Sequence, residues 1–376
     1  MDRREAIAWV LSVCGELRRS QGKTLSELVA AAMVVGRVSL AAIGRKLTGP
    51  SMAKHRIKRT WRFVANHRVM VNDAMRGVVQ HLVKRCHKLE RLGKQRRRSR
   101  LLIALDWTEI RDFHTLMAAA VQRGRALPLL WATYPEWVLH KSQNNLEEGL
   151  LRLLRTMIPE NVEVILLADR GFGRTELART CQQLRFHYVI RIRPDVWIRC
   201  PTFAGKLLDY PVRKGIQRFL KQVSYRKDDA VRHHVVIHWK VGLPKKRDEP
   251  WFLMTNLERK VESLTTLYGK RMTVEELFRD DKNKRNGFSL RHTKITKAER
   301  LDRLLLILAP AYWLLVGIGM LARQRYQPAM WCSSNREKEC SVFTIGRIMI
   351  EQMQVTAALS SAAATTAILE AAEKWG

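Results

Sequence analysis

The N-terminal part of the chain has the apolar period of helices. A helical pattern at 39–47, a turn at 48–50 and a second pattern from Ser51 to about residue 66 predict two helices joined by a tight turn. Ser51 is the expected N-cap of the second helix, because a serine hydroxyl accepts a hydrogen bond from the first unpaired backbone N–H groups. Four apolar side chains at helical spacing should face the core: Ala53, Ile57, Trp61 and Val64.

The opposite side of this second helix is basic. It carries Lys54, His55, Lys58, Arg59 and Arg62. A basic helix after a tight turn is typical of a helix-turn-helix DNA reader. The solvated face of an ordinary amphipathic helix has the same pattern, so the choice between the two depends on the charge of the whole chain.

The apolar period changes near residue 100. Apolar runs at 101–105, 115–122, 126–134, 162–168 and 187–192 predict strands, and the runs on either side of 123–125 predict a hairpin. Helices are expected at 144–158 and up to about residue 184. Strands that alternate with helices indicate an α/β layer with a covered sheet. Short strand-like pieces at 223–226 and 231–241 predict a β-rich insertion, and helices resume from Val261.

A long uncharged segment at 304–322 allows two interpretations. Its 19 residues, at about 1.5 Å per residue, are just long enough to cross a bilayer. The segment contains Pro310, Gly317 and Gly319, and no second segment of this kind is present in the sequence. A helix buried in the core of a globular domain is therefore the favoured interpretation.

The charge narrows the choice of partner. The 376 residues include 68 Lys or Arg and 35 Asp or Glu, a formal net charge of +33 with a pI near 10.6, and a hydrophobic fraction of 46% that excludes general disorder. Such an excess of positive charge fits nucleic acid or an anionic membrane surface and not an ordinary metabolic enzyme. Residues 1–100 hold 24 basic and 6 acidic side chains. This region is the expected binding arm, and the basic run at 84–100 is expected to be a linker that either follows a phosphate backbone or is only solvated.

The cysteines indicate a reducing compartment without structural zinc. The six cysteines form no CxxC pair, and the N-terminus lacks the apolar stretch of a signal peptide.

Two acids follow buried strands. Asp106 comes directly after the run 101–105, and Asp169 comes directly after 162–168. At the carboxyl end of an α/β sheet a charge lies at the crevice where ligands bind. Alternatively, each aspartate only terminates its strand or caps the next helix.

The segment 268–282 contains a second group of polar residues. On a helix wheel Tyr268, Arg271, Glu275 and Lys282 share an arc of about 60°. Chemistry on phosphates needs such a mixture of a carboxylate, cations and a phenol. An exposed salt-bridge face explains Arg271 and Glu275 but not the other two side chains. The neighbouring acids Glu276, Asp280 and Asp281 point elsewhere on the wheel.

Together, Asp106, Asp169 and the Y-x2-R-x3-E-x6-K signature resemble the DDE transposases of bacterial insertion sequences, specifically the insertion-sequence-four group. The resemblance extends over roughly 101–346. It implies an α/β fold with a ribonuclease H-like catalytic core, interrupted by a β-rich insertion and preceded by an all-helical DNA-binding domain. The expected boundaries are 1–95 for the helical domain with its helix-turn-helix, 96–194 and 261–350 for the two parts of the core, 195–260 for the insertion and 351–376 for an Ala-rich tail.

The resemblance also implies roles for individual residues. It assigns Asp106, Asp169 and Glu275 to two divalent ions, Mg²⁺ or Mn²⁺, and Tyr268, Arg271 and Lys282 to the DNA backbone. Trp251 occupies the place of a tryptophan suited to stacking on a flipped base, although a core position explains it equally well. Met272 departs from the tryptophan that many relatives have after the signature arginine.

The expected function is metal-dependent DNA cleavage and strand transfer at the ends of an insertion sequence. The expected partners are double-stranded DNA, both element ends and target, and a second copy of the chain in the end complex, with no membrane. The expected location is the bacterial cytoplasm, with the nucleoid. The alternative is a non-catalytic DNA-binding regulator or an inactive transposase remnant.

Overall fold

The computed structural model describes residues 3–35, 38–92, 100–140, 142–225, 231–242, 249–333, 340–352 and 366–367. The chain forms two compact units: unit 1 consists of Met1–Ser99, Trp107–Lys141 and Thr273–Gly376, and unit 2 consists of Arg100–Asp106 and Ser142–Met272. This grouping differs from the boundaries expected from the sequence. The reason is that helices from both ends of the chain pack together within unit 1.

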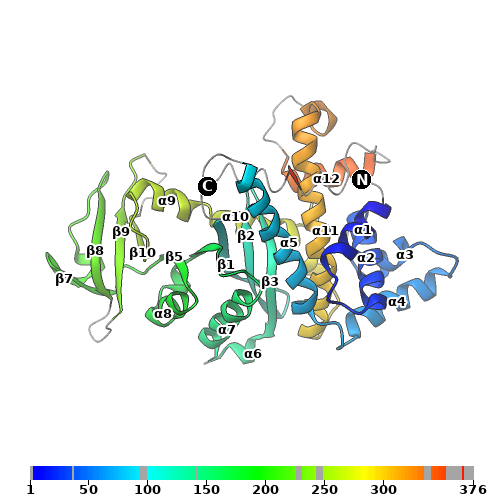
Figure 1. The fold of residues 1–376 in the computed structure, drawn as a ribbon, viewed down its shortest axis with the longest axis horizontal. Helices are drawn as coiled ribbons and strands as arrows, with labels where there is room; N and C mark the ends of the chain where they lie inside the picture. Colours follow the sequence, from blue (N-terminus) through cyan, green and yellow to red (C-terminus); the bar gives the residue numbers. More distant parts are fainter. Residues whose placement is uncertain are drawn as a thin grey trace. The chain divides into compact units, whose positions relative to one another are not determined.

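Unit 1 is mainly helical (Figure 1). Its N-terminal helices are α1 (Arg3–Val13), α2 (Arg19–Met33), α3 (Leu40–Lys46), α4 (Ala53–Ala65) and α5 (Val71–Leu92). The later ones are α6 (Glu136–Leu139), α10 (Met272–Lys282), α11 (Ala298–Arg325) and α12 (Val342–Gln352). Since α5 continues to Leu92, the expectation of a linker from residue 84 is wrong for 84–92, and 93–99 lie outside the described residues.

The two helices predicted at 39–66 are present as α3 and α4, but the predicted core face of α4 is only partly correct: Val64 is buried as expected, whereas Ala53 and Trp61 are exposed. Its N-cap is Met52, not Ser51, and its buried residues are Thr60, Phe63 and Val64. Trp61 is 42% exposed. A Cβ on Gly44 of α3 would lie 2.6 Å from the Cα of Ile57, so the two backbones approach closely there and set which side of α4 is covered.

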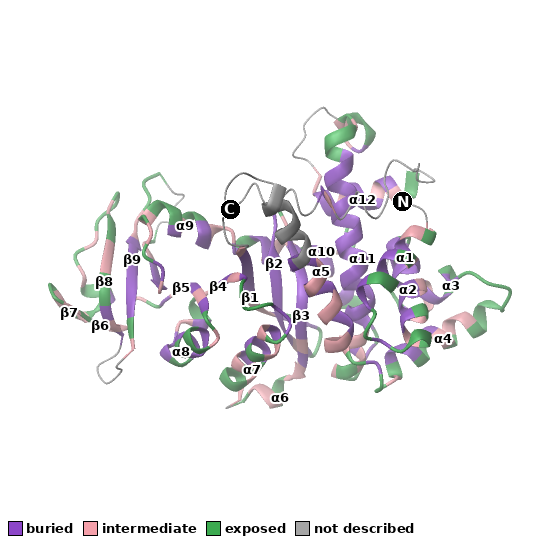
Figure 2. Ribbon diagram, viewed as in Figure 1, coloured by how far each residue is buried: buried purple, intermediate pink, exposed green. Residues whose placement is uncertain are grey.

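The uncharged segment forms the middle of α11, the central helix of unit 1. Its most apolar window is long enough to span a membrane and is 100% buried inside the protein. It packs against α2, α4, α5, α12 and the strand β3 (Ala126–Pro135), and Figure 2 shows it buried along most of its length. The interpretation as a core helix is therefore confirmed.

The hairpin predicted around 123–125 is also present in unit 1. β2 (Phe113–Val121) pairs antiparallel with β3. The turn closes through a hydrogen bond from Gln122 N to Arg125 O at 2.9 Å. Gly124 has a φ of 81°, a left-handed conformation that glycine adopts without strain.

Unit 2 is built on a sheet. β1 (Arg100–Ile110), β4 (Glu163–Ala168) and β5 (Phe186–Arg191) are parallel neighbours. The antiparallel strands follow in the order β10 (Trp251–Thr255), β9 (Arg232–His238), β8 (Gln217–Tyr225), β6 (Trp197–Cys200) and β7 (Phe203–Lys206). The helices of this unit are α7 (Gln143–Arg155), α8 (Thr175–Gln183) and α9 (Val261–Gly269).

Two features of unit 2 bear on the sequence analysis. The β-rich character expected after residue 195 is observed, since β6–β10 all lie in that region. The expectation that a strand ends at Asp106 is wrong, because β1 continues to Ile110. Thr108 and Ile110 are buried while Glu109 is exposed, which is the alternation of a strand.

Candidate active site

Asp106 and Asp169 lie at neighbouring positions of two parallel strands. Leu105 pairs with Ala168 in the register of β1 and β4, and each aspartate is the next residue along its chain. Both side chains are partly exposed. The long apolar strands thus deliver two carboxylates side by side at the carboxyl end of the parallel pair, where α/β sheets bind ligands.

Arg271 contacts the first of these acids. Its Nη1 donates to Asp106 Oδ2 at 3.0 Å, and the two side chains are 10% and 17% exposed. The guanidinium also lies 6.0 Å from the ring centre of Tyr268. The resemblance predicts that Arg271 holds DNA. In this structure its guanidinium balances the charge of the Asp106 carboxylate.

Tyr268 is buried between aromatic and charged neighbours. Its ring centre lies 5.0 Å from that of Trp251, with an interplanar angle of 78°. Burial raises the pKa of Tyr268, and the positive charges of Arg271 and Arg191 offset part of this rise. The phenol consequently keeps its proton at neutral pH and remains a hydrogen-bond donor.

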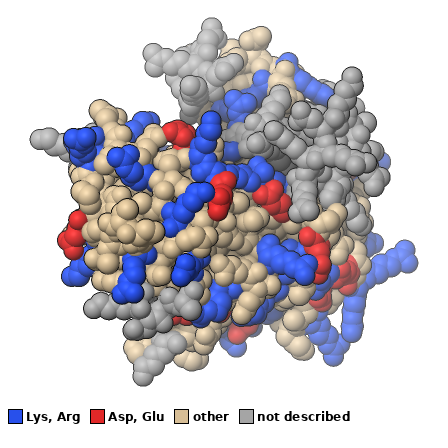
Figure 3. All heavy atoms as spheres, turned by 60° about the vertical axis from the view of Figure 1, so that its left-hand side comes forward, with Lys and Arg blue, Asp and Glu red and all other residues tan. Residues whose placement is uncertain are grey.

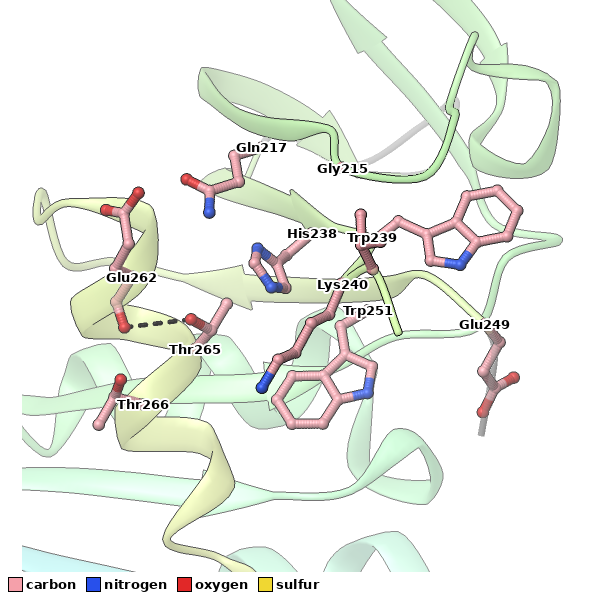
Figure 4. Close-up of a pocket in the computed structure, with 11 residues that line it drawn as sticks. Gly215, Gln217, His238, Trp239, Lys240, Glu249, Trp251, Glu262, Thr265 and Thr266 are labelled. Atoms are coloured by element: carbon pink, nitrogen blue, oxygen red, sulfur yellow. Dashed lines mark hydrogen bonds between the residues drawn. The ribbon is translucent and has the colours of Figure 1, made fainter. Parts of the chain in front are cut away.

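Trp251 is half-buried and lines a cavity of about 590 Å³. Figure 4 shows its indole beside the Lys240 side chain, with Trp239 and His238 from the neighbouring segment on the same cavity. Burial lowers the pKa of His238, and Lys240 adds to this effect while Glu262 opposes it. The cavity therefore offers an indole face together with a lysine ammonium.

The segment that carries Asp169 is fixed on several sides. Asp169 Oδ1 accepts from Gly171 N at 2.8 Å and caps the 3-10 helix η1 (Arg170–Phe172). Tyr225 of β8 donates its hydroxyl to Gly173 O at 2.6 Å. Arg174 pairs with the buried Glu147 of α7. A Cβ on Gly173 would lie 2.9 Å from a backbone oxygen of the adjacent strand β5, so the segment also packs closely on the sheet.

Sequence reasoning missed Tyr225 and Arg191. Arg191 follows Ile190, which pairs with Ala168, so it occupies the next position beside Asp169 on the adjacent parallel strand. It pairs with Glu249 at 2.6 Å. The strand expected at 187–192 runs through Arg191, so the sequence pattern did not mark this residue as part of a site. Tyr225 had no signal either, because its partner is 52 residues away.

The four residues of the tyrosine signature do not share one helix. Tyr268 lies in α9, Arg271 lies in the turn that follows it, and Glu275 and Lys282 lie in α10. The single helix wheel was therefore wrong, because the chain leaves α-helical geometry at 270–271. Tyr268 and Arg271 belong to unit 2, whereas Glu275 and Lys282 belong to unit 1.

The other acids of α10 form a network within unit 1. Arg125 Nε donates to Asp280 Oδ2 at 2.6 Å, and the Tyr312 hydroxyl donates to the same oxygen at 2.9 Å. Glu276 lies 3.5 Å from Arg125. Burial, together with Asp280, raises the pKa of Asp281 to about 8. Glu276, Asp280 and Asp281 thus belong to a polar network inside unit 1.

The basic side chains of α4 divide into two groups. Lys54, Lys58 and Arg62 are exposed. Arg59 instead donates to Glu27 Oε2 of α2 at 2.6 Å. Basic side chains also predominate on the face of the molecule drawn in Figure 3.

The carboxylates of Asp106 and Asp169 are suitable ligands for a hard divalent cation. Carboxylate oxygens are the ligands that Mg²⁺ and Mn²⁺ prefer. Among the residues that the structure describes, no group of three or more His, Cys, Asp or Glu side chains is close enough to hold a metal ion by itself. Unit 2 places two carboxylates, those of Asp106 and Asp169, directly after the paired segment of two parallel strands.

A family model described as "transposase DDE domain" matches residues 97–314. A comparison with the curated proteins found no match.

Proposed function

The chain belongs to the transposase DDE domain family, whose model covers more than half of it, and we propose that it is an active transposase of the insertion-sequence-four group. It cleaves DNA at the ends of its element and joins these ends to target DNA. The observation that carries this proposal is the placement of Asp106 and Asp169 next to each other, directly after the paired segment of the parallel strands β1 and β4. A ribonuclease H-like core requires such a placement. DNA is the partner that the family implies, and two element ends favour a dimer of the chain in the bacterial cytoplasm.

Asp106, Asp169 and Glu275 would hold the Mg²⁺ or Mn²⁺ ions. When bound, these ions stabilise the negative charge on the entering and leaving oxygens at phosphorus. Glu275 is four residues beyond Arg271, the partner of Asp106, and it is partly exposed on α10. Its neighbours Glu276 and Asp280 pair with Arg125, and the resemblance assigns the role of third acid to Glu275.

Arg271, Tyr268 and Lys282 bind the DNA backbone in this proposal. A guanidinium has five N–H donors, so Arg271 can contact Asp106 and still donate to a phosphate oxygen. Tyr268, which keeps its proton, donates through its hydroxyl. Trp251 offers a half-buried indole on a cavity of about 590 Å³, which supports stacking on a displaced base.

Recognition of the element ends is assigned to the helical region 1–95. Lys54, Lys58 and Arg62 present exposed cations on one helix, while Arg59 fixes α4 to α2 through Glu27. Replacing the three exposed cations by alanine should weaken DNA binding and reduce its salt dependence, because fewer counterions are released. Arg59→Ala should instead lower the stability of the fold.

The test is cleavage of a plasmid that carries the two element ends, with and without Mg²⁺ or Mn²⁺. Asp169→Asn should abolish cleavage and leave DNA binding intact. Asp195→Asn is the matched control, because Asp195 is an exposed acid of the same unit. A parent protein that binds the ends but does not cut them with either metal would instead be the regulator or inactive remnant.

A further inference from the structure

Helix α4 carries an exposed indole beside the cations that the proposed function assigns to DNA. The apolar period of the sequence predicts Trp61 in the core, but in the structure its side chain is 42% exposed. Folding leaves this large apolar surface in water, although most tryptophans are largely buried. The position of Trp61 among its neighbours on the helix indicates a use for that surface.

The outer face of α4 combines Trp61 with three cations. The helix is continuous over Ala53–Ala65, so a helix wheel describes it. With Lys54 at zero, Lys58 lies at about 40° and Arg62 at about 80°. Trp61 lies at about 340°, only about 20° from Lys54 on the other side. All four side chains are exposed, so they form one outer face that spans an arc of about 100°.

The inner side of α4 holds this outer face in place. Phe63 and Val64 are buried against the rest of unit 1. Arg59 donates from Nη1 to Glu27 Oε2 at 2.6 Å and from Nη2 to Thr24 Oγ1 at 3.2 Å, so the helix is also fixed to α2. A rotation that buried the indole would break these contacts, and Trp61 is therefore kept on the surface.

The charge and the length of the outer face fit duplex DNA. The sequence of α4 contains no Asp or Glu, so the indole is surrounded by positive charge on its own helix. A duplex offers both phosphates for the cations and, in the major groove, the apolar methyl groups of thymine. From Lys54 to Arg62 the helix rises about 12 Å, which is close to the width of the major groove, about 12 Å.

We propose that Trp61 determines part of the sequence specificity for the element ends, with its indole in the major groove against thymine methyl groups. This assignment rests on the proposed role of α4 in DNA recognition. Phosphate contacts from the lysines and Arg62 are the same for every sequence, whereas an apolar contact with a thymine methyl group depends on the base. The cations therefore supply affinity for any DNA, and Trp61 adds discrimination.

The experiment measures binding of the full chain to a duplex with the terminal sequence of its element and to a scrambled duplex of equal composition. Fluorescence anisotropy is recorded between about 50 and 200 mM salt. Trp61→Ala should weaken binding of the end duplex about tenfold and that of the scrambled duplex less than about twofold, with the salt dependence unchanged. Lys58→Ala should weaken both and lower the slope of log K against log salt by about one. Trp137→Ala is the matched control, since its indole is 78% exposed in the same unit but outside α4.

A second measurement tests the methyl contact directly. Replacing thymine by deoxyuridine in the end duplex removes the methyl groups and leaves the phosphates in place. The parent protein and Trp137→Ala should lose affinity for this duplex, whereas Trp61→Ala should lose little more, because its contact is already absent. Trp61→Phe keeps a smaller apolar ring and should show an intermediate loss, which keeps the test usable if Trp61→Ala does not fold.

Two results would overturn the inference. One is equal weakening of the end and scrambled duplexes by Trp61→Phe, and the other is a deoxyuridine effect in the Trp61 variants as large as in the parent. Self-association of the parent that the Trp61 variants abolish, with DNA binding unchanged, would assign the outer face to a second copy of the chain and refute the DNA assignment. Unchanged DNA binding after replacement of all three cations by alanine would instead remove the proposed role of α4 in recognition.

Discussion

Breaking the buried ion pair between Glu147 and Arg174 should strongly destabilise unit 2. Arg174 donates from Nη1 to Glu147 Oε2, and the two side chains are only 8% and 1% exposed. Glu147→Ala would leave the arginine charge buried. Its remaining contacts would be Asn144 O at 3.2 Å and Glu148 at 3.8 Å.

Breaking a buried pair by removing one partner typically costs about 3–5 kcal/mol. Because Glu148 still offers a carboxylate, we expect a loss of about 3 kcal/mol for Glu147→Ala. Whole domains have only about 5–15 kcal/mol of stability, so this loss is large. Arg174 directly follows the segment that carries Asp169, and we therefore expect cleavage activity to become more sensitive to temperature as well.

The assay is urea unfolding followed by tryptophan fluorescence, with the change in free energy taken from the shift in midpoint. Glu160→Ala is the matched control: Glu160 and Arg185 form a pair at 3.2 Å with side chains 81% and 79% exposed, which should contribute less than about 1 kcal/mol. Replacing both Glu147 and Arg174 by methionine should recover part of the loss. Equal effects of Glu147→Ala and Glu160→Ala would refute the reasoning.

Three further predictions concern pH, packing and the site. The pKa of Asp281 in the folded protein, about 8, exceeds its value in the unfolded chain. The free energy of unfolding should therefore fall by up to about 1.4 kcal/mol per pH unit as the pH rises from 4 to 8. The urea midpoint of Asp281→Asn should decline less over this pH range than the midpoint of the parent protein. A Cβ on Gly346 would lie 1.9 Å from Leu315 O, so Gly346→Ala should lower the melting temperature, whereas Gly149→Ala, with open space around it, should raise it. Arg271→Lys should slow plasmid cleavage at least about tenfold, because an ammonium cannot replace a bidentate guanidinium, with the metal concentration for half-maximal activity unchanged.

Several local features of both units could be predicted from the sequence. The strand-end position of Asp169 follows from a single uninterrupted apolar run, and the β2–β3 hairpin follows from two runs around Gly124. The length and isolation of the uncharged segment were enough to predict a buried helix. These features depend on neighbours within about ten residues, where the side-chain period is informative.

The features that escaped prediction depend on distant contacts. The outward position of Trp61 results from the packing of α4 on other helices, among them α11, whose residues lie over 200 positions away. Helix α9 ends at Gly269 and α10 starts separately at Met272, and no proline in the sequence marks this break. The hydroxyl of Tyr225 reaches Gly173 across the sheet. A periodic pattern contains no information about such partners.

The geometry makes the capping of η1 by Asp169 compatible with a role of the same carboxylate in chemistry. A carboxylate has about four lone-pair positions, and the N–H of Gly171 uses one of them at 2.8 Å. That hydrogen bond restricts the side-chain torsions and so fixes the direction of the remaining lone pairs. A cation ligand benefits from such restriction, because less conformational entropy is lost when the ion binds. In the proposed metal site, the capping of η1 would therefore orient Asp169, and the contact with Arg271 would orient Asp106 on the neighbouring strand in the same way.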